Sequence, residues 1–234
     1  MKSQKTAFDT TNLSLSQQIY ERLRLSLMAG RYPPGSRLNI SRLAQEFGVS
    51  ATPVREAVVQ LVREQALELR RGHQARVPVP EIAHYIQVRE TRVPLERLAA
   101  ELATTHITDE GIDELEALHR SYVTCEERED WLGALAANQS FHFRIYEASA
   151  NPVLKSVLEN FWLIAGPFIT NQYPALRNAH TDPHPHNSLI EALRRRSAPE
   201  AGDALVRDLR DGSYHVVAWL KANKLRADGT VAKE

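Results

Sequence analysis

The sequence predicts a mainly α protein in two parts: an N-terminal winged helix-turn-helix domain over 1–77 and, after a linker at 78–81, an all-α helical bundle over 82–234. Three observations predict it. Apolar residues recur at helical spacing along most of the chain. Two short helical segments flank one tight turn at Gly48. Residues 1–78 carry 12 Lys and Arg against 6 Asp and Glu, a net charge of +6, whereas the rest carries −6. This split suggests two domains with different partners.

Bulk features place the chain among soluble proteins. Its 234 residues fit one large domain or two small ones. Cys125 is the only cysteine, which excludes a disulfide framework within one chain and indicates a reducing compartment. The N-terminus has no apolar core of signal-peptide length, and the longest apolar stretch, VLENFWLIAGPFI, is too short for a membrane span. We therefore expect a cytoplasmic protein without a membrane partner.

The N-terminal part contains three predicted helices. The first runs over 15–30, and a turn rich in proline and glycine follows it. The second, over 40–47, ends at Gly48. The third begins near Thr52, which we expect to cap it, with Pro53 in its first turn. Its buried stripe is formed by Val54, Ala57, Val58, Leu61 and Val62.

A basic hairpin is predicted next. Apolar residues alternate over 67–79 around the sequence RRGHQ, which is typical of two strands with a basic tip. Three helices and such a hairpin form a winged helix, whose recognition helix enters the major groove of DNA. Arg55 then reaches a guanine edge or a phosphate, and Ser50 and Thr52 contact phosphates. The alternative is that Arg55 is a solvated arginine on a purely structural bundle. The charge of this part favours DNA.

The C-terminal part is predicted to be entirely helical, because no segment has a convincing strand pattern. About 150 residues can bury a core and a small ligand site. The expected helices lie roughly at 81–105, 109–129, 131–149, 151–170, 184–197 and 199–223.

Polar residues on the apolar stripes of these helices are the candidate site. Asn138 and His142 are four residues apart on one face, His186 shares a face with leucines, and Asp208 falls on the stripe of the last helix. A buried carboxylate is rarely left without a partner, so the four could meet at one metal ion. The alternative is a set of hydrogen-bonded core residues. Five other histidines show no comparable placement: His106, His119, His180, His184 and His215.

The N-terminal residues resemble the DNA-binding domain of GntR-family transcription regulators. The resemblance covers about sixty residues and rests on PPGSRL, LAQEFGVS and TPVREAVVQL. Ala51 stands where members often carry an arginine, which implies a different operator half-site. The resemblance implies that the DNA contacts are Ser50, Thr52, Arg55, Gly72 and His73.

The C-terminal part resembles the FCD ligand-binding domain of the FadR-type subgroup, through RVPLERLAAELA, NQSFHFRIYEASANPVL and HNSLIEAL. Many members bind a metal through an aspartate and three histidines. The matching positions here are Asn138, His142, His186 and Asp208, so the first carboxylate is lost and the last position gains one. Such a nitrogen and oxygen set suits zinc, nickel, manganese or cobalt.

The same resemblance implies a small carboxylate effector held by Arg92, on the first helix of this part. The alternative is a surface salt bridge between Arg92 and Glu96, which is four residues further on. We interpret the arginines at 194–196 as a solvated helix end.

These features together predict a homodimeric transcription regulator, a repressor by resemblance, that binds double-stranded operator DNA. An enzyme is not expected, because no nucleophile or phosphate-binding loop accompanies the polar cluster. Two alternatives remain: a metal-dependent enzyme that uses His142, His186 and Asp208, and a protein-interaction module with a degenerate head.

Overall fold

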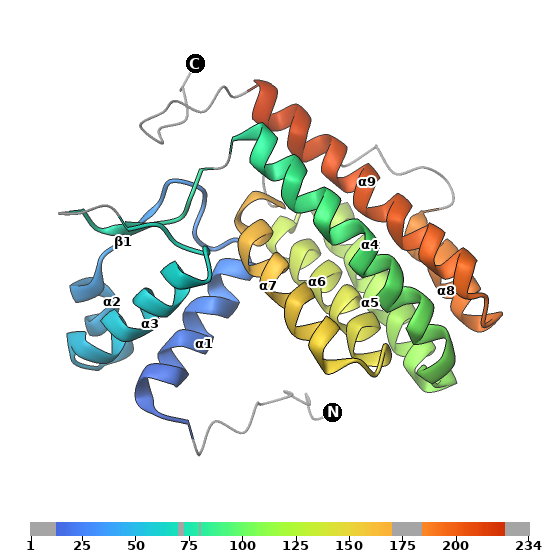
Figure 1. Ribbon diagram of the computed structural model, residues 1–234, viewed down its shortest axis with the longest axis horizontal. Coiled ribbons are helices and arrows are strands. Elements are labelled where there is room, and N and C mark those ends of the chain that lie inside the picture. The colour runs from blue at the N-terminus through green and yellow to red at the C-terminus, as the bar shows by residue number, and fades with distance from the viewer. Residues whose placement is uncertain (1–12, 70–72, 80, 170–183, 223–234) are drawn as a thin grey trace.

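The computed structural model describes residues 13–69, 73–79, 81–169 and 184–222. These form a smaller lobe, the head (residues 13–79), and a larger helical lobe, the body (residues 81–222) (Figure 1). The head contains α1 (Leu15–Met28), α2 (Ile40–Phe47) and α3 (Ala51–Arg63). The body contains α4 (Ile82–His106), α5 (Asp109–Glu127), α6 (Trp131–Ala148), α7 (Pro152–Ile169), α8 (Pro185–Arg194) and α9 (Ala198–Ala222).

The predicted helix-turn-helix is formed by α2 and α3. Gly48 ends α2 at φ +68, a left-handed conformation that glycine adopts without strain. The cap of α3 differs from the prediction: the helix begins at Ala51, so the N-cap is Ser50 and not Thr52. Ser50 has the extended backbone of an N-cap, and Pro53 still falls in the first turn, where no N–H is needed.

The wing is only partly the predicted hairpin. Two antiparallel strands pair, β1 (Arg37–Leu38) and β2 (Ala75–Arg76). The segment before β2 contributes a single bridge, in which Glu68 and Arg76 exchange backbone hydrogen bonds of 2.9 and 3.0 Å. The strand at β1 was predicted as part of a turn. That turn brings the chain back along β2, because the Gly35 N–H donates to the Val77 carbonyl at 2.9 Å.

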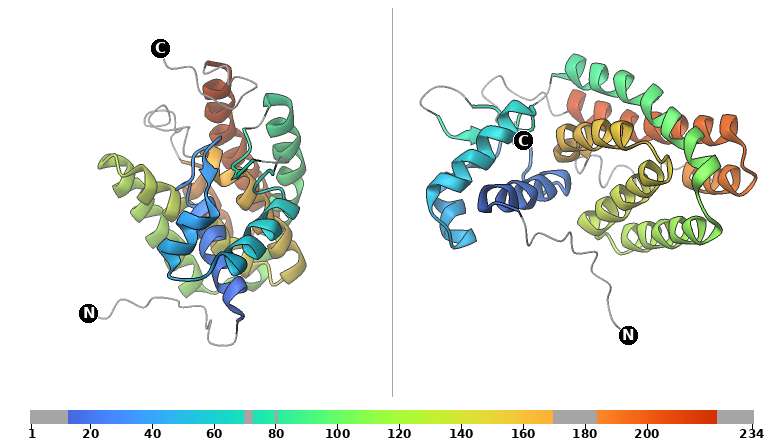
Figure 2. Two further views of the ribbon diagram at one scale, coloured as in Figure 1. Left: turned by 90° about the vertical axis from the view of Figure 1, so that its left-hand side faces the viewer. Right: turned by 60° about the horizontal axis from the view of Figure 1, so that its bottom comes forward.

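The body is the predicted all-α bundle, and each of its helices lies within three residues of the predicted bounds. The long helices α4 and α9 run side by side, and α5 packs with α6 (Figures 1 and 2). The arginines at the end of α8, residues 194–196, are exposed, as predicted. They also form contacts: Arg194 pairs with Glu116 of α5 at 2.7 Å, and Arg196 donates to the carbonyl of Thr104 at 3.3 Å. These contacts connect the end of α8 to α4 and α5.

The head rests on the body through α1 and α7 (Figure 2). A Cβ atom added to Gly166 would lie 2.7 Å from the carbonyl oxygen of Met28, so only glycine allows this approach of the two helices. Beside this contact, Arg24 and Glu159 form an ion pair of 2.9 Å. Buried apolar residues of both lobes form one continuous cluster. In the described ranges, no helix combines the length and the apolar character that crossing a membrane requires.

Candidate functional site

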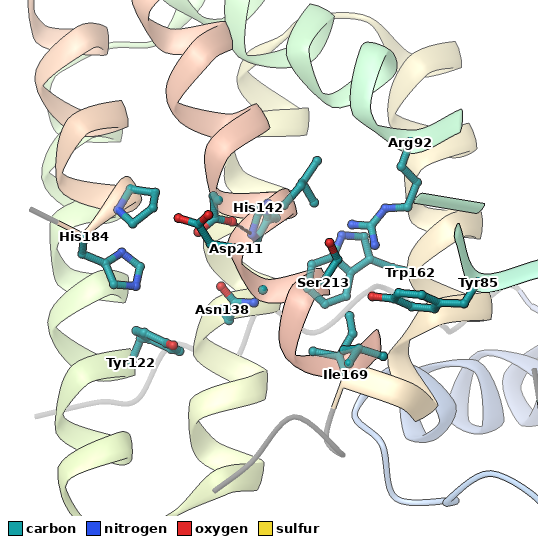
Figure 3. Close-up of a pocket in the computed structure, with 15 residues that line it drawn as sticks. Tyr85, Arg92, Tyr122, Asn138, His142, Trp162, Ile169, His184, Asp211 and Ser213 are labelled. Atoms are coloured by element: carbon teal, nitrogen blue, oxygen red, sulfur yellow. Dashed lines mark ion pairs between the residues drawn. The ribbon is translucent and has the colours of Figure 1, made fainter. Parts of the chain in front are cut away.

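A pocket opens in the body between α4, α6, α7 and α9, with the start of α8 at one end (Figure 3). Tyr122 and His184 line the end near α8, and Arg92, Trp162 and Tyr85 line the other. Asn138, His142 and Asp208 lie between these ends. The pocket therefore joins an end with one imidazole and one phenol to a cationic and aromatic end.

Three of the four predicted metal ligands, His142, His186 and Asp208, meet at this pocket, and two of them, His142 and Asp208, line it. His142 of α6 and His186 of α8 are each 1% exposed. His142 Nε2 lies 3.2 Å from one Asp208 carboxylate oxygen, and His186 Nε2 lies 3.4 Å from the other. Donor atoms of the three residues all lie within 4.8 Å of one another. Helical periodicity placed all three on buried stripes, and the fold brings those stripes together.

Asn138 stands one turn before His142 on α6 and is half-buried. Its side chain points into the pocket beside His142 (Figure 3). An amide oxygen at this position is a weaker cation ligand than a carboxylate, because it carries no charge. Asn138 therefore lines the same pocket as His142 and Asp208.

Glu96 is a buried carboxylate that sequence reasoning treated only as a surface partner of Arg92. It is 0% exposed, and its Oε2 lies 3.4 Å from His142 Nδ1. His142 thus lies between two carboxylates, Glu96 and Asp208. Burial alone would lower the pKa of His142, but hydrogen bonds to Asp208 and Glu96 outweigh it and raise this pKa to about 9. In the absence of a cation, His142 is an imidazolium at neutral pH.

The pKa values of the two carboxylates and of His186 are also shifted by their surroundings. Burial would raise the pKa of Glu96, but the nearby charges of Arg92 and His142 lower it to about 2. Burial would raise the pKa of Asp208 as well, but the hydrogen bond to His142 and the charge of that imidazolium lower it. Burial lowers the pKa of His186 well below its usual value, so His186 is neutral.

Arg92 combines features of both predicted alternatives. It pairs with Glu96 of the same helix, with Nε 3.1 Å from Oε1, but this pair is buried rather than on the surface, since Arg92 is 7% exposed. Its guanidinium carbon lies 5.3 Å from the centre of the Trp162 ring. Arg92 also lines the pocket (Figure 3). A guanidinium held in this way is oriented before any ligand arrives.

Two histidines that the sequence analysis left without a role lie beside this cluster. His119 Nδ1 of α5 is 3.3 Å from His186 Nδ1. His184 is the N-cap of α8, and its Nδ1 accepts the His186 N–H at 3.0 Å. His119 follows the buried residues Ile112 and Leu115 at helical spacing, so the criterion applied to the other helices would have found it.

The predicted DNA-binding residues lie on the outer side of the head. Ser50, Thr52 and Arg55 are exposed at the start of α3, and His73 is exposed in the wing. Gly72 lies outside the described residues. The opposite face of α3 is buried in the head through Val54, Ala57, Val58 and Leu61. The head thus presents the start of α3, as a recognition helix must.

A winged helix-turn-helix head joined to a helical body with an internal polar pocket defines the class of DNA-binding transcription regulators that carry a ligand domain. Family comparison agrees: residues 15–77 match the bacterial regulatory proteins of the gntR family, and residues 87–211 match the FCD domain. The chain belongs to the GntR family of transcription regulators, in its FadR-type subgroup.

The chain is similar to several curated regulators. It is 31% identical over 185 residues to the HTH-type transcriptional regulator McbR of Escherichia coli, covering 78% of this chain and 84% of that protein. It is 27% identical over 217 residues to the HTH-type transcriptional repressor NanR of Escherichia coli, covering 82% and 80% of the two chains. These relatives are transcription regulators, which overturns the alternative of a metal-dependent enzyme.

Solved structures agree in fold. The structure of Escherichia coli McbR/YncC matches with a TM-score of 0.80 at 27% identity, covering 87% of this chain and 97% of that chain. A putative GntR regulator from Rhodococcus matches with a TM-score of 0.72 at 19% identity, covering 87% and 97%, and supports the fold alone.

Proposed function

We propose that this regulator is a cytoplasmic, homodimeric repressor that leaves double-stranded operator DNA when a small carboxylate and a divalent cation occupy the body pocket. One observation carries the proposal: His142 and Asp208 of the imidazole–carboxylate cluster line the same pocket as the buried Arg92. A cation and a guanidinium are the two groups that hold carboxylates most directly.

The donor set fits a divalent cation. His142, His186 and Asp208 supply two imidazole nitrogens and a carboxylate that converge within 4.8 Å, and Asn138 adds an amide from the pocket wall. This set suits zinc, nickel, manganese or cobalt. Glu96 behind His142 is the carboxylate that commonly orients a metal-binding histidine. A bound cation supplies an open coordination position for an anionic ligand.

The other end of the pocket suits the organic part of the effector. Tyr85, Trp162 and Ile169 provide apolar contact, and Ser213 provides a hydroxyl (Figure 3). An effector carboxylate near Arg92 competes with Glu96 for the guanidinium. Both the ion pair and the orientation of His142 therefore respond to the ligand.

In the proposal, helix α7 carries this change to the head. Trp162 lines the pocket, and Gly166, one turn further along α7, lies against the backbone of Met28. Because Gly166 contacts the backbone of Met28 directly, no flexible side chain lies between the two helices. A shift of α7 therefore displaces α1. Ligand binding then changes the relation of the two heads in a dimer, and with it the fit to a two-fold operator.

The proposed DNA contacts are Ser50, Thr52, Arg55, Gly72 and His73. Support comes from the exposure of the start of α3 and from the net charge of +6 in residues 1–78. The repressor role rests on NanR, a relative that is named a repressor.

A thermal-shift screen of the full chain against small carboxylates, with and without a chelator, tests the proposal. We expect at least one carboxylate to raise the melting temperature only when Zn²⁺ or Co²⁺ is present. Stabilisation by carboxylates that is the same with chelator would remove the cation from the proposal. A gel shift with the protein's own promoter region tests the remaining alternative, since a protein-interaction module would leave this DNA unshifted.

A further inference from the structure

The ring of His186 is held on three sides. Its Nε2 faces Asp208 at 3.4 Å, and its Nδ1 faces His119 Nδ1 at 3.3 Å. The flat face of the ring stacks on Phe141, with ring centres 3.9 Å apart and planes 13° apart. Rotation of this ring by 180° would exchange nitrogen for carbon at both polar contacts. The contact with His119 therefore helps to keep Nε2 directed at Asp208.

The contact also places a hydrogen-bond partner at Nδ1 of His186. Two imidazole nitrogens that face each other form a hydrogen bond only when one of them is protonated. A neutral histidine that binds a cation through Nε2 carries its proton on Nδ1, and that N–H needs an acceptor. Nδ1 of His119 occupies the acceptor position, and His119 is itself only 9% exposed.

We propose that His119 is a positioning residue for His186: it accepts the Nδ1–H of His186 and so keeps Nε2 available to a cation at Asp208 and His142. The inference rests on the cation centre proposed above. It assigns a role to a residue of α5, a helix that supplies none of the proposed ligands.

A rival interpretation makes His119, His184 and His186 a second cation site, since donor atoms of these three also lie within 4.8 Å of one another. The arrangement of His184 argues against it. The Nδ1 lone pair of His184 accepts the backbone N–H of His186 at 3.0 Å, as the cap of α8. A neutral imidazole whose Nδ1 accepts a hydrogen bond carries its proton on Nε2, so neither nitrogen offers a lone pair to a cation.

Two variants of His119 separate the positioning role from packing. His119→Leu fills the space but accepts no hydrogen bond. His119→Asn places an amide oxygen near the position of Nδ1 and retains an acceptor. The affinity of each full-length protein for Zn²⁺ alone is measured by competition with a chelator, together with the number of ions bound per chain. Circular dichroism of the metal-free proteins checks the fold.

We expect one ion per chain in the unaltered protein. His119→Leu is expected to lower its affinity by about 10- to 100-fold, and His119→Asn to bind close to the unaltered protein. Equal affinity in all three proteins, or equal loss in both variants, would overturn the inference. Two ions per chain would make His119 a ligand and overturn it as well. Failure of the unaltered protein to bind any ion would overturn both this inference and the proposed cation centre.

A measurement on the unaltered protein covers the case in which His119→Leu does not fold. Long-range ¹H–¹⁵N spectra of the Zn²⁺-loaded protein report which ring nitrogens are protonated. We expect a proton on Nδ1 of His186 and none on Nδ1 of His119. The reverse assignment would contradict the positioning role.

Discussion

Glu96 Oε2 lies 3.4 Å from His142 Nδ1, and neither side chain is more than 2% exposed. On the far side of the imidazole, His142 Nε2 lies 3.2 Å from Asp208. Glu96 also pairs with Arg92. This single carboxylate therefore connects the cationic end of the pocket to the imidazole cluster.

Glu96→Gln should destabilise the metal-free protein strongly. The amide keeps the shape of the side chain but removes the charge that compensates Arg92, and breaking a buried pair typically costs about 3–5 kcal/mol. The matched control is Glu101→Gln on the same helix. Glu101 pairs with Arg97 at the same spacing, but with side chains 32% and 38% exposed, so its loss should cost about 0–1 kcal/mol. Urea denaturation measures both. Equal, small effects would mean that the buried pair contributes little.

The proposed cation centre has an amide at Asn138 and a carboxylate at Asp208, so substitutions at these two positions should change Zn²⁺ affinity in opposite directions. Asp208→Asn removes the carboxylate that faces both histidines and should weaken Zn²⁺ binding by at least about 10-fold. Asn138→Asp adds an anionic ligand and should tighten it. Elemental analysis and chelator competition measure both variants. If no cation binds here, Asn138→Asp should instead only destabilise the protein, because it places a second carboxylate beside Asp208.

The stability of the chelator-treated protein should be greatest near pH 6.5. His142 has a pKa of about 9 in the folded protein against 6.5 in the unfolded chain, so its contribution is complete below pH 6.5 and is lost as the pH rises through 9. His186 has a lowered pKa, so protonation of the unfolded chain reduces stability as the pH falls below 6.5. Protonation of Glu96 and Asp208 reduces stability further in acid, because the pKa values of these carboxylates are lowered in the folded protein.

Denaturation between pH 5 and pH 10 measures this profile, and His142→Asn serves as its control. The decline above pH 7 should be on the order of 1–3 kcal/mol and should be absent from the control. A flat profile between pH 6.5 and pH 9 would show that His142 is neutral in the metal-free protein.

Arg55→Ala should weaken binding to operator DNA by roughly 1–3 kcal/mol if the side chain reads a base, and should mainly reduce the salt dependence if it contacts phosphate. Arg63→Ala is the control, because Arg63 is also exposed on α3 but lies at its opposite end. Binding measured at several salt concentrations distinguishes the cases. Unchanged binding of Arg55→Ala at low salt would rule out α3 as the recognition helix.

Helical periodicity was sufficient to predict the body helices and the inward positions of His142, His186 and Asp208. The strand at β1 was missed because two residues are too few to display alternation. The cap of α3 was misplaced by two residues, since Ser50 and Thr52 are both good cap residues and only the backbone conformation distinguishes them.

The rest of the site depends on distances between helices, which no local pattern encodes. His119 and His186 are 67 positions apart in the chain, and only the packing of α5 against α8 brings them within hydrogen-bonding distance. The spacing of Arg92 and Glu96 indicated an ion pair as one of two alternatives, but not its burial, which depends on α6 and α7 covering this face of α4.

If a carboxylate in the body pocket releases DNA from the head, fluorescence anisotropy of labelled promoter DNA will detect the release. With Zn²⁺ present, the carboxylate selected by thermal shift should lower the DNA affinity of the unaltered protein by about 5- to 150-fold. Arg92→Lys keeps the charge beside Glu96 but loses the planar fork. This variant should bind DNA equally well and should require a much higher effector concentration for release. If both proteins leave DNA at the same effector concentration, or if no carboxylate changes the DNA affinity, Arg92 and this pocket do not control DNA binding.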